Sequence, residues 1–210
     1  MRPLLPICSL AGILLACALV HPANAATTEP DWPCMQRKVP ELSLAQIWNG
    51  PELPDTAKGW ENDPDIAKRV RELAARRLPL PDAEQQIKDF AASLPPDKLV
   101  PAMTMLEQGL FDHMNAERSR VMSGITRYAR KQIEVAADLR KEASELDDLT
   151  AKPDADPNQV TQLTDRLNWE TRVFDERVKS LTYVCEVPTL IEQRLYQLSK
   201  TIADTLAPKK

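Results

Sequence analysis

The fold of this chain is decided by residues 121–167, which read VMSGITRYARKQIEVAADLRKEASELDDLTAKPDADPNQVTQLTDRL. Before the proline-containing break, apolar residues recur at alternating spacings of four and three, and the pattern resumes after it. The positions are Val121, Ile125, Tyr128, Val135, Leu139, Leu146 and Leu149, then Val160, Leu163 and Leu167. This is the repeat of a coiled-coil seam, with Gln132 and Glu142 as polar interruptions. Because a short loop between two long helices makes them antiparallel neighbours, the stretch predicts an antiparallel coiled-coil hairpin.

The hairpin extends beyond this stretch in both directions, over residues 102–186. Residues 102–150 contain no proline and predict a helix of up to 49 residues, about 73 Å long. The returning arm begins with Asp156 as N-cap and Pro157 as first residue. Pro188 lacks the amide N–H that a helix needs, and Thr189 with Glu192 forms a capping-box pattern. We therefore expect a kink or a break there and a C-terminal helix over residues 189–206.

The rest of the chain predicts a small helical base. In the helical domain, residues 62–206, two short helices precede the hairpin: one is capped by Asp63, and one begins near Asp82. Residues 26–61 carry several prolines and predict an irregular segment with one short turn, which Ser43 caps. The predicted fold class is all-α: a long hairpin with a small helical base, wrapped by an irregular segment that contains proline and tryptophan.

Residues 1–25 have the pattern of a signal peptide. Arg2 is followed by an apolar run, and Ala23 and Ala25 supply the small side chains that precede a cleavage site. The alternative is a lipoprotein signal, because residues 14–17, LLAC, resemble a bacterial lipobox that ends at Cys17. We expect a periplasmic or secreted protein, or a lipid-anchored envelope protein if Cys17 is lipidated.

Cleavage after Ala25 would leave two cysteines, Cys34 and Cys185. In an oxidising compartment these are expected to form a disulfide, with two free thiols as the alternative. Counted from the turn, Cys185 should face Ser123 on the first arm. The bridge would then attach the wrapping segment to the hairpin where the cover of the base ends.

The charge balance bears on the class of partner. Without residues 1–25 the chain has 26 basic and 31 acidic side chains, a net charge of −5. This argues against a nucleic acid or an anionic membrane as the main partner. We expect no membrane span in the mature chain, and another periplasmic or envelope protein as partner. The oligomeric state stays open.

The chain has few residues that could carry chemistry. Beyond the signal sequence its only histidine is His113, and the motifs of zinc proteases, haem attachment, serine hydrolases and phosphate loops are missing. A copper site is conceivable at Met103, Met105, His113, Met114 and Met122, although methionines also fill cores. We expect no cofactor, no metal and no catalytic residue, and whether the chain is an enzyme stays open.

Two hypotheses for function remain. The first is a protein-interaction or scaffold factor that acts through the exposed coiled-coil hairpin. The second is a small-ligand-binding protein or unusual enzyme with its pocket near the N-terminal tryptophans Trp32, Trp48 and Trp60. Bulky side chains in a segment without its own core also serve to pin that segment to neighbouring helices, which is the structural alternative for the three.

Overall fold

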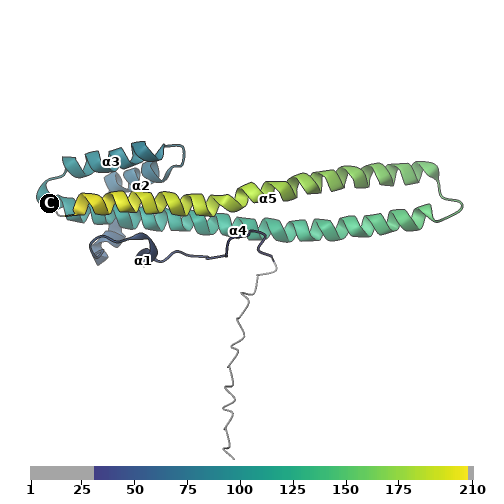
Figure 1. Cartoon of the computed structure of the whole chain (residues 1–210), viewed down its shortest axis with the longest axis horizontal. Helices are drawn as coiled ribbons and strands as arrows, with labels where there is room; N and C mark the ends of the chain where they lie inside the picture. The colour runs from purple at the N-terminus through teal and green to yellow at the C-terminus, as the bar shows by residue number, and fades with distance from the viewer. Residues whose placement is uncertain (1–30, 208–210) are drawn as a thin grey trace, which may run out of the picture.

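The computed structural model describes residues 31–207, and every regular element in that range is helical (Figure 1). The helices are α1 (Leu44–Ile47), the 3-10 helix η1 (Asp55–Asn62), α2 (Pro64–Ala74), α3 (Leu80–Ser93), α4 (Pro96–Thr150) and α5 (Pro157–Leu206). α4 and α5 run antiparallel and pack against each other as the predicted hairpin, so the all-α fold class is confirmed. The signal sequence expected in residues 1–25, with Cys17, lies outside the described residues.

The short helices gather at one end of the hairpin and form the base. η1 and α2 pack on α4, and α3 packs on α5, while the turn between the long arms lies at the far end (Figure 1). Fully buried side chains from α2, α3, α4 and α5 make the core of the base: Val70, Ile87, Met103, Leu106, Leu110, Met114, Ile191, Leu195, Leu198 and Ile202.

Side chains cap the N-termini of α2 and α5 as the sequence predicts. The Asp63 carboxylate accepts from the backbone N–H groups of Asp65 and Ile66 at 3.0 and 3.1 Å, and caps α2. Asp156 caps α5 by accepting from the N–H of Asn158 at 2.9 Å. At the other end of α2, buried Arg194 of α5 donates two hydrogen bonds to the Leu73 carbonyl. That carbonyl would otherwise be an unpaired helix end in the core.

The structure differs from the prediction in the start of two helices and in the presence of a third. α3 begins at Leu80, two residues before Asp82, and α4 begins at Pro96 instead of residue 102. Proline is tolerated in a first helical turn, and Pro101 removes only one hydrogen bond, while Thr104 Oγ1 donates to the carbonyls of Val100 and Pro101. The third difference is that η1 occupies part of residues 26–61, which were predicted to be irregular apart from one turn. The turn capped by Ser43 is α1.

The C-terminal helix predicted over residues 189–206 is not separate: of the kink and the break expected at Pro188, the break does not occur. α5 continues through Pro188 as one helix, and its ribbon changes direction part-way along (Figure 1). Pro188 is buried, and the residues on both sides are held: Cys185 by its disulfide, and Ile191 by the core. The side-chain amide of Gln36 donates to the Cys185 carbonyl, which lies in the turn that Pro188 disturbs. The hydrogen bond that the proline removes is the one to the Val184 carbonyl, and packing on both sides of Pro188 offsets its loss.

Residues 31–42, here called the strap, run along the hairpin from its middle toward the base. Polar side chains on one face of α4 bind the strap backbone: Arg118 donates to the Val39 carbonyl at 2.6 Å, and Ser119 donates to the Pro40 carbonyl at 2.8 Å. Asn115 accepts from the Leu42 N–H at 3.0 Å. A chain segment without regular structure needs such partners for its backbone, because α4 covers the groups that water would otherwise satisfy.

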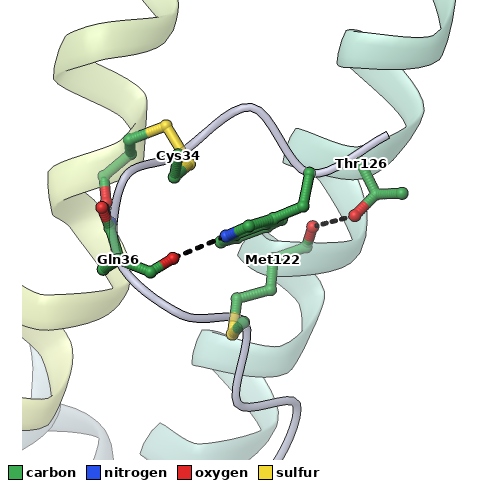
Figure 2. Close-up of a disulfide and its surroundings, with 6 residues drawn as sticks. Cys34, Gln36, Met122 and Thr126 are labelled. Atoms are coloured by element: carbon green, nitrogen blue, oxygen red, sulfur yellow. Dashed lines mark hydrogen bonds between the residues drawn. A yellow bond between two sulfur atoms is a disulfide. The ribbon is translucent and has the colours of Figure 1, made fainter. Parts of the chain in front are cut away.

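A disulfide joins the strap to α5. Cys34 and Cys185 are bonded, with their Cα atoms 5.5 Å apart. Around them lies a second, small cluster of buried side chains, in which Met122 and Ile125 of α4 meet Trp32 of the strap. Figure 2 shows Cys34 between the two long helices, with Met122 and Thr126 on α4. The bridge therefore lies at the level of Ser123, where counting residues from the turn places it.

Candidate functional site

The structure distributes the three N-terminal tryptophans along the base. Trp32 belongs to the disulfide cluster, whereas Trp48 and Trp60 pack on the main core. Each indole N–H is used within the chain: Trp32 donates to the Gln36 carbonyl at 2.7 Å (Figure 2) and Trp48 to the Pro51 carbonyl at 2.6 Å. Trp60 donates to the Asp112 carboxylate at 3.0 Å. These contacts are what pinning tryptophans make, and they do not bring the three rings to one pocket.

One cavity is lined by Trp32. It measures about 150 Å³ and lies between the strap and the long helices, with Trp32, Arg118 and Glu192 in its wall. Arg118 is buried and pairs with Glu192 at 3.5 Å, while its Nε atom has no hydrogen-bond partner within the described residues. The cavity is small beside typical ligand pockets of roughly 300–1,000 Å³. Its size suits a few water molecules better than an organic ligand.

The residues considered for copper do not form one site. Met103 and Met114 are fully buried in the main core, Met105 packs at its edge, and Met122 lies in the disulfide cluster. His113 is half-buried on α4. In residues 31–207 no three His, Cys, Asp or Glu side chains gather as metal ligands would. The methionines act here as core filling.

The outer hairpin, defined as residues 128–150 of α4 and 157–181 of α5 with the turn between them, differs sharply from the base. None of residues 133–184 is buried. The seam side chains of both arms, such as Val135, Leu139 and Phe174, are only half-buried, because two helices alone cannot enclose a core. Tyr128, predicted to lie in the seam, is exposed, and Ala129 is buried in the place expected for it. The outer hairpin thus has an open apolar seam.

Trp169 is the most conspicuous side chain of the outer hairpin. It is 66 % exposed, and it lines two adjoining grooves. The larger, of about 420 Å³, lies between the arms and includes Val135 and Leu139 of α4 and Val173 of α5. The smaller, of about 350 Å³, follows α5. A tryptophan exposed beside a groove is the kind of side chain that dominates protein interfaces.

Polar groups without partners accompany this groove. Glu142 lines it and binds Arg166 of the opposite arm through Oε1 at 3.5 Å, but its buried Oε2 has no hydrogen-bond partner in the described chain. No bond within residues 31–207 uses the indole N–H of Trp169. On α4, the buried Gln132 Oε1 also lacks a partner and lies at a third groove of about 290 Å³, beside exposed Ile133. Buried polar atoms are normally paired with protein or with ordered water, so Glu142 Oε2 and Gln132 Oε1 are open to water or to a partner.

Trp169 was not predicted as a site residue, because it lies outside the seam positions from which the hairpin was predicted. Trp169 falls two residues after the seam position Leu167 and is surrounded by polar residues. The sequence did contain a signal. Aromatic residues are only 5 % of the chain, and a tryptophan outside the seam of a two-helix arm has no core to fill. Such a residue is better placed for binding than for folding.

No helix within residues 31–207 combines the length and apolar character that crossing a bilayer requires. Comparisons of the chain with models of protein families, with curated proteins and with solved structures found no match in any of the three.

Proposed function

We propose that this is an exported, periplasmic interaction or scaffold protein that acts through its outer hairpin. The observation that carries the proposal is the exposure of Trp169 beside grooves that run along an apolar seam. The base has its own hydrophobic core and the Cys34–Cys185 disulfide to stabilise it, whereas the outer hairpin extends far beyond that core. An arm that adds little burial but presents a tryptophan and unpaired polar atoms is suited to binding a protein partner.

Export is part of the proposal. It is supported by the signal-like pattern of residues 1–25 and by a disulfide pair that stays oxidised in the periplasm but is rarely kept in the cytosol. The intact mass of the protein purified from a periplasmic fraction tests this point. A chain that begins at Ala26 supports cleavage. A chain that begins at Cys17 with added acyl groups shows a lipid-anchored protein, and a chain that retains Met1 in the cytosol refutes export.

Site-specific cross-linking in cells tests the interaction. A photoreactive amino acid replaces Arg172, which lines the smaller groove beside Trp169, and in a matched variant it replaces Tyr196, which is 44 % exposed on the base end of α5. We expect protein adducts at position 172 that do not form at position 196. Adducts of equal yield at the two positions, or none at 172, would contradict a binding role for the outer hairpin.

A further inference from the structure

We infer that the partner of the outer hairpin is a second copy of this chain, packed antiparallel so that the tip of each hairpin lies against the middle of the other. The inference rests on the proposed function, because it names the occupant of the same surface. The arguments are the distribution of charge along the hairpin, the area of its open face and the position of Trp169.

The two ends of the outer hairpin carry net charges of opposite sign. Its distal part, residues 142–165, contains seven acidic and one basic side chain, a net charge of −6. Its proximal part, residues 128–141 and 166–181, contains eight basic and five acidic side chains, a net charge of +3. Asp31 of the strap pairs with Arg130 and lowers this to +2. One molecule therefore carries both of two complementary surfaces.

This polarity selects one arrangement. In a parallel pair the two acidic tips would lie side by side and repel each other. In an antiparallel pair each acidic tip lies against the proximal part of the other copy, so charges of opposite sign meet in both halves of the interface. The same patch then serves both subunits, as a closed two-fold dimer requires.

The open face has the area that a stable dimer needs. The two arms of the outer hairpin are about 35 and 38 Å long, and two helices side by side are about 20 Å wide, which gives a face of about 700 Å². Stable interfaces bury about this area on each partner. Two open seams facing each other also form a four-helix bundle, in which residues such as Leu139 and Phe174, half-buried in one hairpin, are enclosed.

Trp169 lies where such an interface has its centre. The boundary between the acidic and basic parts falls between residues 141 and 142 on α4 and between 165 and 166 on α5, at the Glu142–Arg166 ion pair. Trp169 is three residues from this boundary, about 5 Å along the helix. The two-fold axis therefore brings the two Trp169 side chains close to the middle of the interface. Residues that dominate binding energy cluster in that position.

Sedimentation equilibrium of the mature protein over the micromolar range tests the inference. We expect a dimer whose dissociation constant rises at least about tenfold in Trp169→Ala and stays unchanged in the matched base variant Tyr196→Ala. Small-angle scattering should give a maximum dimension of about 130 Å, against about 85 Å for one molecule, since the hairpins overlap only in their outer parts.

A charge variant tests the antiparallel arrangement. Neutralising the tip with Glu145→Gln, Asp147→Asn and Asp148→Asn should weaken the dimer and reduce its dependence on salt. A parallel dimer would instead be strengthened by this change, which would overturn the arrangement. A protein that remains monomeric at all concentrations overturns the inference itself. If the cross-linker at position 172 then still captures a different protein, the proposed function stands without the dimer, and if it captures nothing, both are refuted.

Discussion

Ser199 Oγ donates a hydrogen bond of 2.8 Å to Glu107 Oε1 in the core of the base, where both side chains are fully buried. The second carboxyl oxygen of Glu107, Oε2, has no hydrogen-bond partner within the described residues. Burial raises the pKa of Glu107 from an ordinary value of 4.5 to about 7, and the bond from Ser199 opposes part of that rise. A protonated carboxyl group is thus the form that the folded base favours at mildly acidic pH.

The protein should therefore lose stability as the pH rises. Below pH 4.5 the Glu107 carboxyl is protonated in both the folded and the unfolded state, so its contribution to the free energy of unfolding is fully present. Between 4.5 and about 7 the folded state keeps a proton that the unfolded state has released, and the free energy of unfolding falls by up to about 3 kcal/mol over this window. Thermal melts from pH 5 to 8 measure this fall.

Glu107→Gln is the variant that isolates the effect. It keeps an acceptor for Ser199 but cannot ionise, so the pH dependence of its melting temperature should be flatter than that of the parent. Exposed Glu61 gives the matched control, since Glu61→Gln should leave the slope as it is. Equal slopes for the parent and for Glu107→Gln would show that Glu107 does not titrate in this range.

The hairpin and its disulfide were predictable because both follow from long-range regularities. The seam spacing gives two helices, the short turn makes them antiparallel, and counting from the turn brings Cys185 to the level of Met122 and Ile125. Pro188 was misread because the sequence shows the hydrogen bond that a proline removes, but not the strap that comes back to the same turn. Gln36, 149 residues away in the sequence, supplies that contact.

Gly109 illustrates another contact that the sequence hides. A glycine inside a long helix reads as a weak point, yet a Cβ atom there would lie 2.6 Å from Val70 Cγ2 and 2.9 Å from Trp60 Cδ2. Gly109→Ala should destabilise the protein by about 1–3 kcal/mol through overpacking, although alanine is the better helix former. Urea unfolding measures the change.

Gly124 provides the comparison for this experiment. A Cβ atom there meets only the end of the Arg127 side chain, at 3.9 Å. Gly124→Ala should therefore stabilise the protein by about 0.5–1 kcal/mol. If Gly109→Ala stabilises the protein as Gly124→Ala does, the close approach of Trp60 and α2 to α4 at Gly109 is not a constraint.

Removing the disulfide should loosen the strap and lower stability. In the chain-entropy account a bridge over so long a loop stabilises by at most about 5 kcal/mol. The double variant Cys34→Ser, Cys185→Ser should melt at a lower temperature, and its strap amides should exchange faster, while the core of α4 and α5 stays protected. Reductant should lower the melting temperature of the parent and leave that of the variant unchanged. A parent that does not respond to reductant would show that the hydrogen bonds from Asn115, Arg118 and Ser119 hold the strap without the bridge.

The base should fold without the outer hairpin. Replacing residues 128–181 by a short Gly/Ser turn removes only two buried side chains, Ala129 and Gln132, and leaves both clusters of the base with the Cys34–Cys185 pair intact. Helix signal in circular dichroism should decrease in proportion to the deleted residues, melting should stay cooperative, and thiol labelling should find no free cysteine. A shortened protein that melts without cooperativity, or that exposes free thiols, would show that the outer hairpin is part of the folding unit. In that case the contribution of the outer hairpin to stability would explain its length, and that length would no longer support a binding role for Trp169.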